Sequence, residues 1–255
     1  MEHYFISAFA VLIFMIIIYT IAQIIKDNSI VDIFWGIGFI VISSVLMIYF
    51  NHLELMHILL YLAILVWGLR LSIHIWQRNK GKPEDFRYAE WRKNWGSKAW
   101  LYAFFKVFML QGLVMFIIAL PVITALSRPE VNISLFNYVG LFLFVLGFLF
   151  EAIGDYQLKT FKKKNKGKIM DKGLWKITRH PNYFGEAVLW WGIFIFCFQQ
   201  TSDLIFIVSP IIMTILLRFG SGVPMLEKKY QNKPEFISYA AKTPVFFPII
   251  GKKGI

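Results

Sequence analysis

Polar side chains of several chemical types are concentrated in one stretch of this apolar chain, GLWKITRHPNYFGE, from Gly173 to Glu186. A long apolar run follows directly. Polar groups at a membrane boundary are costly unless they bind something. A helix that begins here would also direct backbone N–H groups and a positive dipole end toward its approach loop, which suits a phosphate or a carboxylate. The candidate ligand-binding side chains in this stretch are Arg179, His180, Asn182, Tyr183 and Glu186.

The same stretch has a simpler interpretation as a basic collar that anchors a helix to lipid headgroups. Lys176 and Arg179 would serve that purpose. Anchoring does not require a histidine, an amide, a phenol and a carboxylate within the seven residues from His180 to Glu186. The composition therefore favours a binding site.

Ionisable side chains also occur inside the apolar runs, where charges are functional candidates that are expected to have a partner nearby. Two sets follow helical i+4 spacing and so share one helix face. They are Arg70, His74 and Arg78, and further along Glu151, Asp155 and Lys159. Asp32 in VDIFWG and Arg218 at the end of the last apolar run are further candidates. The alternative role for these charges is to form ion pairs that lock helices together.

The loop RNKGKPEDFRYAEWRKNW combines charges with tyrosine and tryptophan. One interpretation is a short amphipathic segment that lies at the membrane interface. The other is a lid whose Arg78, Arg87 and Tyr88 close over a cofactor. Both predictions place the loop beside the basic face of the protein.

Composition places the chain among polytopic membrane proteins. Of its 255 residues, 58% are hydrophobic and only 16% are charged, which is too little charge for a soluble domain of this size. Apolar runs near the length of about 20 residues that crosses a bilayer recur along the chain. The single Cys197 excludes an intrachain disulfide framework.

The runs predict an all-α bundle of seven transmembrane helices in one integral membrane domain, 1–255. The sixth and seventh runs are short and are expected to extend into their flanks. The predicted spans are Tyr4–Ile25, Val31–Phe50, Met56–Trp76, Leu101–Leu126, Leu135–Leu158, Phe184–Phe198 and Leu204–Phe219.

With seven spans, all but three of the 27 lysines and arginines fall on one side, which the positive-inside rule makes cytoplasmic. The N-terminus would then face outward. Residues 220–255 are expected to fold back under the bundle. The net charge of +12 is consistent with binding to anionic lipid or to a phosphorylated cofactor. No recognition motif points to nucleic acid.

Several common catalytic signatures are absent from the sequence. It has no GxGxxG or Walker loop, no His/Cys cluster with zinc spacing and no GxSxG elbow. A soluble-type Rossmann domain, a metal site and nucleophilic hydrolysis are therefore not expected.

A set of motifs across most of the chain resembles the bacterial branch of the steroid 5α-reductase superfamily. These motifs are VDIFWG, RLSIHIWQRNKGKPEDFRY, EAIGDYQLKTFK, GLWKITRHPNYFGE and SGVPMLEKKY…YAAKTPVFFP. The resemblance implies a seven-helix membrane reductase, placed in the bacterial inner membrane with its active site toward the cytoplasm. It implies hydride transfer from NADPH to the C=C of an α,β-unsaturated carbonyl in a steroid- or lipid-like substrate. The implied partners are the lipid-like substrate and membrane lipids. No obligate protein partner is implied.

The resemblance also implies roles for particular residues. Asp155, Lys162, Asn182, Tyr183, Glu186 and Arg218 would line the cofactor. Asp32 stands near the family's glutamate of the second helix, and Glu151 replaces a family asparagine. His74 stands where animal members have the tyrosine that contacts the substrate carbonyl. We therefore expect His74, with Asp32 nearby, to donate a hydrogen bond or a proton to that oxygen.

Two other function classes remain open from the sequence. The RHPNY element also resembles the RHPxY of isoprenylcysteine carboxyl methyltransferases, which implies S-adenosylmethionine as the alternative cofactor. The third class is a non-catalytic lipid-binding or scaffold protein, which would bind neither cofactor. NADPH and S-adenosylmethionine titrations would separate the three.

Overall fold

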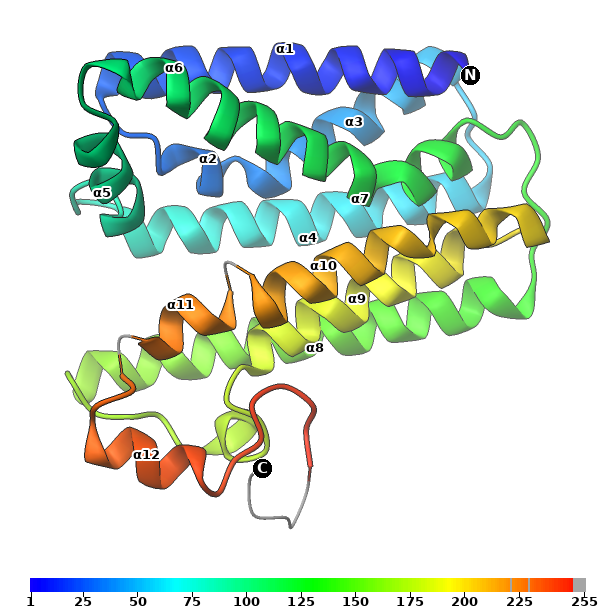
Figure 1. Ribbon diagram of the computed structural model, residues 1–255. Coiled ribbons are helices and arrows are strands. Elements are labelled where there is room, and N and C mark those ends of the chain that lie inside the picture. Colours follow the sequence, from blue (N-terminus) through cyan, green and yellow to red (C-terminus); the bar gives the residue numbers. More distant parts are fainter. Residues whose placement is uncertain (221, 229, 250–255) are drawn as a thin grey trace. The chain divides into compact units, whose positions relative to one another are not determined.

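A computed structural model describes residues 1–220, 222–228 and 230–249. The regular elements of this described part are all helices, so the all-α prediction is confirmed there (Figure 1). The chain divides into two compact units. The N-terminal unit contains Met1–Ile133 with Gln199–Thr201, and the C-terminal unit contains Ser134–Phe198 with the part that follows Thr201.

The N-terminal unit consists of helices that follow the first four apolar runs. Left-handed conformations at Lys26 (φ 56°) and Asn51 (φ 52°) end the first and third helices. Its elements are α1 (Glu2–Ile25), α2 (Ile30–Ile33), α3 (Trp35–Phe50), α4 (Leu55–Asn79), α5 (Phe86–Trp95), η1 (Gly96–Lys98), α6 (Ala99–Ala103), the π-helix η2 (Phe104–Met109) and α7 (Leu110–Leu126).

Close backbone contact joins α3 to α4 within this unit. A Cβ atom on Gly36 would lie 2.4 Å from the carbonyl oxygen of Gly68, so neither position accepts a side chain. Phe39 and Trp67 pack edge to face nearby with ring centroids 5.4 Å apart, and both are fully buried. This contact fixes the position of α2, which leads into α3, and of the polar end of α4.

The C-terminal unit contains the hairpin of α8 and α9, which run side by side in Figure 1. A capping box of Ser134 and Asn137 begins α8, and Pro181 occupies the first turn of α9, where its missing N–H is tolerated. The elements are α8 (Leu135–Lys164), η3 (Gly173–Lys176), α9 (Pro181–Cys197), η4 (Thr201–Ile207), α10 (Val208–Phe219), α11 (Val223–Lys228) and α12 (Pro234–Ala240).

Glycines spaced seven residues apart let α8 and α9 touch through their backbones. Gly140 and Gly147 of α8 face Gly192 and Gly185 of α9. A Cβ on Gly147 would lie 2.5 Å from both the oxygen of Gly185 and the nitrogen of Leu189. The repeat continues at Gly154, where a Cβ would lie 3.2 Å from the nitrogen of Asn182. The glycines thus bring the start of α9 against the polar end of α8.

Five helical segments of the described residues are long and apolar enough to cross a membrane. They are Glu2–Ile25, Leu55–Asn79, Phe86–Leu126, Leu135–Lys164 and Thr201–Lys228. The expected second span is interrupted at Phe34, and the remaining α3 has 16 residues. The expected sixth span corresponds to α9, which has 17 residues. Helices of this length reach only about 25 Å, short of a hydrocarbon core of about 30 Å.

The expected tail 220–255 includes residues 221, 229 and 250–255, which lie outside the described residues. The described part forms α11 and α12 and then returns toward the segment before α9. The nitrogen of Ile249 donates to the oxygen of Ile177 at 3.2 Å. The described part of the tail therefore belongs to the C-terminal unit.

Candidate functional site

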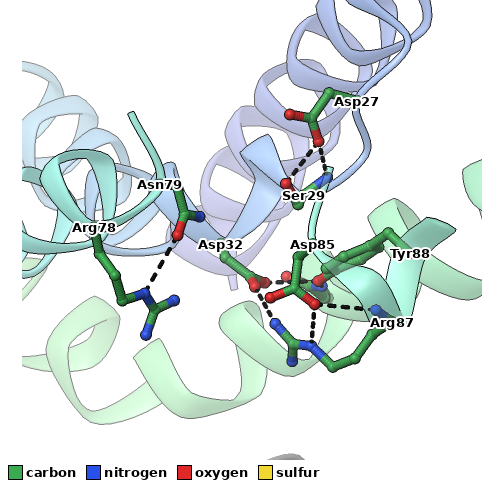
Figure 2. A network of polar contacts seen from close by, with 9 residues as sticks. Asp27, Ser29, Asp32, Arg78, Asn79, Asp85, Arg87 and Tyr88 are labelled. Carbon is green, nitrogen blue, oxygen red and sulfur yellow. Dashed lines mark hydrogen bonds and ion pairs between the residues drawn. The ribbon is translucent and has the colours of Figure 1, made fainter. Parts of the chain in front are cut away.

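The structure gathers two of the expected site residues, Arg87 and Tyr88, around a third, Asp32, in the N-terminal unit (Figure 2). Arg87 Nη2 lies 2.7 Å from Asp32 Oδ2, and the Tyr88 hydroxyl donates to Asp32 Oδ1 at 2.6 Å. Tyr88 is only 3% exposed. Asp32 lies on α2, whereas Arg87 and Tyr88 lie in the first turn of α5. The cluster therefore joins two helices whose contacting residues, Asp32 and Arg87, lie 55 positions apart in the sequence.

The first turn of α5 is held by Asp85, which acts as its N-cap. Asp85 Oδ1 accepts from the backbone nitrogen of Arg87 at 3.1 Å and from Arg87 Nε at 2.9 Å. Burial alone would raise the pKa of Asp85, but the hydrogen bonds and charge of Arg87 outweigh it and lower that pKa. Gln111 Nε2 donates to the Tyr88 hydroxyl at 3.3 Å. Arg87 and Tyr88 are therefore held in place, with Asp32 as their shared acceptor.

A second ion pair fixes the loop that carries these residues. Arg92 contacts Glu84 through Nη2 at 2.9 Å, and Glu84 also accepts from the backbone nitrogen of Asn28 at 2.7 Å. Arg78 is exposed and its Nε donates to Asn79 at 3.3 Å. His74 is half-buried on α4. The expected pairing of His74 with Asp32 stays a prediction.

Buried carboxylates line the contact between α8 and α9 in the C-terminal unit. Glu151, Asp155 and Glu186 are between 2% and 7% exposed. Asn182 Nδ2 donates to Asp155 Oδ1 at 3.1 Å, which joins two of the residues that the resemblance had assigned to the cofactor. This bond orients the amide of Asn182. Its Oδ1 is buried and has no hydrogen-bond partner within the described structure.

Arg179 and His180 meet at Glu227, a residue of α11. Arg179 Nε lies 2.8 Å from Glu227 Oε1, and Arg179 Nη2 lies 3.2 Å from Oε2. His180 Nε2 lies 2.9 Å from the same Oε1. Arg179 Nη1 donates to the oxygens of Ala240 and Thr243, each at 3.1 Å. Arg179 therefore clamps the C-terminal segment against the start of α9, in addition to any contact with a ligand.

Further hydrogen bonds secure this clamp on both sides. The Thr178 hydroxyl donates to the oxygen of Phe246 at 2.7 Å, and the Tyr239 hydroxyl donates to the oxygen of Trp175. Trp175 Nε1 in turn donates to the oxygen of Gly154 at 3.0 Å, which attaches the segment to α8. The RHPNY segment is thus held between α8 and the tail.

The remaining expected residues occupy less enclosed positions. Tyr183 stacks on His180, with ring centroids 5.8 Å apart and planes 13° apart. Lys162 is exposed in the last turn of α8. Arg218 lies over the ring of Phe219 at 4.7 Å. Among the described residues, no group of three or more His, Cys, Asp or Glu side chains is arranged to hold a metal ion.

Sequence reasoning missed Glu227 and the glycine repeat. Glu227 lies 48 residues from Arg179, so no local spacing could reveal the pair. The glycines were readable, because Gly140, Gly147 and Gly154 repeat every seven residues, as do Gly185 and Gly192. Such a repeat is typical of helices in close backbone contact.

We expect His180 to make the C-terminal unit less stable in acid. Burial lowers the pKa of His180 below its ordinary 6.5, and Arg179 and Arg218 lower it further, against the opposing effect of Glu227. The unfolded chain then takes up the proton at a higher pH than the folded chain. The contribution of neutral His180 to the free energy of unfolding is therefore fully present above pH 6.5. It declines as the pH falls from 6.5 through the lowered pKa of the folded state.

Thermal unfolding in detergent at about pH 7.5 and about pH 5.5 tests this expectation. The melting temperature should fall in acid, and His180→Gln should fall less because glutamine does not titrate. An equal fall in both proteins would show that other groups cause the acid sensitivity.

Residues 18–243 match a family model described as a protein of unknown function, DUF1295. The chain belongs to the DUF1295 family. This family is steroid 5α-reductase-like in general, so the resemblance is confirmed at that level. An uncharacterised protein of Schizosaccharomyces pombe is 24% identical over 243 residues, which cover 84% of this DUF1295 chain and 67% of the relative. No solved structure matches the chain significantly.

Proposed function

We propose that this DUF1295 protein is a membrane reductase that uses NADPH to reduce the C=C of an α,β-unsaturated carbonyl in a steroid- or lipid-like substrate. The observation that carries the proposal is membership of a family that is steroid 5α-reductase-like in general. The assignment to the bacterial branch of the superfamily is part of the proposal and rests on the motifs.

The C-terminal unit supplies the proposed cofactor-binding residues. Half-buried Asn182 is hydrogen-bonded to buried Asp155, Glu151 and Glu186 are also buried, and Asn182 Oδ1 is a buried atom without a partner in the described structure. An unpaired buried acceptor costs about 1–3 kcal/mol, which a ligand donor would recover. The donor set therefore fits a polar nucleotide. When bound, NADPH would supply a hydride equivalent, and these residues would orient it and exclude water.

The proposed residues for the substrate carbonyl are His74 and Asp32. His74 would donate a hydrogen bond or a proton to the oxygen, where negative charge develops during reduction. Asp32 is anchored by Arg87 and Tyr88, so its carboxylate has a defined position on α2. Arg78 would add positive charge at the end of α4.

We also propose the number of membrane crossings and the orientation of the protein. Seven crossings, with α3 and α9 as short spans, place all lysines and arginines but Arg70, Lys106 and Arg128 on one side. The positive-inside rule makes that side cytoplasmic and the N-terminus external. In the proposal the protein lies in a bacterial inner membrane and binds its cofactor from the cytoplasm.

Quenching of tryptophan fluorescence by NADPH tests the proposed function. The chain has 9 tryptophans, and Trp175 lies on the segment that precedes α9. Asn182→Ala and Asp155→Ala should each weaken NADPH binding about tenfold or more, because each removes one partner of the Asn182–Asp155 hydrogen bond. Asn165→Ala is the matched control, since Asn165 bonds only its own helix end in the described contacts.

Three outcomes would contradict the proposal. Equal NADPH titration of wild type, Asn182→Ala and Asp155→Ala would remove these residues from the cofactor site. Quenching by S-adenosylmethionine but not by NADPH would favour the methyltransferase that the RHPNY element also resembles. Absence of response to either nucleotide would favour a non-catalytic lipid-binding protein.

A further inference from the structure

The His180 side chain has an unusual hydrogen-bonding state. Its residue is 6% exposed, and the ring lies between Tyr183, stacked at 5.8 Å, and Trp175, with centroids 6.5 Å apart. Nε2 contacts Glu227 Oε1 at 2.9 Å. Nδ1 is buried and has no hydrogen-bond partner in the described structure.

The contact with Glu227 determines which ring nitrogen carries the proton. Arg179 contacts both oxygens of Glu227, at 2.8 and 3.2 Å, which favours the ionised carboxylate. An ionised carboxylate only accepts hydrogen bonds, so His180 Nε2 must be the donor. Burial lowers the pKa of His180, which favours the neutral ring. In the neutral Nε2–H tautomer, Nδ1 is a bare acceptor.

Asn182 presents the same chemistry two residues later. Its Nδ2 donates to Asp155 Oδ1 at 3.1 Å, so its Oδ1 is fixed as the acceptor, buried and unpartnered. Native proteins leave few buried polar atoms unpaired, and each such atom needs an explanation. Two fixed acceptors in one short segment require a donor that the described chain does not supply.

We infer that His180 Nδ1 is a ligand-binding acceptor that takes an O–H or N–H group of the nucleotide, and that Glu227 is the positioning residue that holds the required tautomer. The inference rests on the proposed function and adds a chemical restriction to it. Nucleotide phosphates carry acceptor oxygens, whereas ribose hydroxyls, the adenine amine and a carboxamide carry donors. His180 is therefore assigned to the nucleoside parts of the ligand and not to its phosphates.

Two substitutions of His180 distinguish the role of Nδ1 from the role of Nε2. Glutamine can place its amide near the position of Nε2 and donate to Glu227, but it offers nothing at Nδ1. Asparagine can place its oxygen near Nδ1 but does not reach Glu227. His180→Gln should therefore weaken NADPH binding about tenfold, while His180→Asn should retain more of the affinity. His52→Gln, in the N-terminal unit, is the matched control and should bind as wild type.

Nitrogen-15 NMR of histidine-labelled wild-type protein tests the tautomer without any substitution. His180 should show one protonated nitrogen and one bare nitrogen, and NADPH should shift the bare Nδ1 resonance. Pyrophosphate alone should not shift it. Glu227→Gln should shift the two resonances toward a mixture of tautomers, since a neutral amide no longer requires Nε2 to donate.

The outcomes distinguish this inference from the proposed function. NADPH binding that is equal in wild type and His180→Gln would overturn the inference and leave the reductase proposal standing. An Nδ1 resonance that responds to pyrophosphate, or not to bound NADPH, would also overturn it. Failure of wild type to bind NADPH at all would overturn both.

Discussion

Gly185→Val is expected to prevent assembly of the α8–α9 hairpin. A Cβ at Gly185 would lie 2.5 Å from the nitrogen of Glu151 and from the oxygen of Gly147, and neither backbone atom can move aside as a flexible side chain could. The helices would have to separate along the whole contact. We expect a loss of at least about 3 kcal/mol, the upper end of ordinary overpacking. Thermal unfolding in detergent, followed by size-exclusion chromatography, measures the effect.

Two positions on the partner helix α8 serve as controls for Gly185→Val. Leu149→Phe adds volume on the exposed face, where Leu149 is 47% exposed, and should be nearly neutral. Gly154→Ala should have a smaller effect, because its Cβ would meet Asn182 and Pro181 at 3.2 Å, a contact that a small shift relieves. A wild-type melting temperature for Gly185→Val would show that α8 and α9 do not touch through their backbones.

Gly154→Ala also bears on function, because Asn182, in the first turn of α9, faces it. A shift of α9 by a few tenths of an ångström would lengthen or misalign the Asn182–Asp155 hydrogen bond. We expect its effect on the melting temperature to be small. The glycine repeat thus connects helix packing to the proposed cofactor residues. Close approach of the two backbones is what brings Asn182 within 3.1 Å of Asp155.

Arg179→Ala is expected to release the C-terminal segment from the start of α9. The substitution removes the bidentate contact to Glu227 and the donors to Ala240 and Thr243. Of its two contacts described above, Glu227 would then keep only the one with His180. Removal of one partner from a largely buried ion pair costs about 3 kcal/mol. Limited proteolysis should then cut within α11 or α12 much faster than in wild type.

Two variants isolate the geometry of this clamp from its charge. Arg179→Lys keeps the charge but lacks the planar fork, so we expect intermediate protection. Lys176→Ala removes an exposed basic residue from the same segment and should behave as wild type. Equal protection in Arg179→Ala and wild type would show that Thr178, Tyr239 and the other contacts suffice to hold the tail.

The clamp and the ligand are coupled in our proposals through Glu227. The same carboxylate accepts from Arg179, which holds the tail, and from His180, which is assigned to the nucleotide. Release of the tail is therefore expected to disturb the tautomer of His180. This coupling can be observed in the nitrogen-15 spectrum of Arg179→Ala.

The sequence alone determined that the chain is helical and apolar enough for a membrane. Its long apolar runs correspond to helices because the backbone of each helix satisfies its own hydrogen bonds locally. It also identified the segment around Asn182, since a dense polar stretch beside an apolar run needs no tertiary information to be noticed. The number of spans was less accessible, because α3, with 16 residues, is shorter than its apolar run suggests, and α9 reaches only 17 residues although it extends beyond its run.

Only the tertiary structure decided which polar residues pair. Asp32 binds Arg87, 55 residues away, and Arg179 binds Glu227, 48 residues away. Such partners depend on how helices pack and on where loops return, and neither is encoded in local spacing. The glycine contacts show the reason most clearly, because they allow two backbones to meet and thereby fix the positions of every side chain around them.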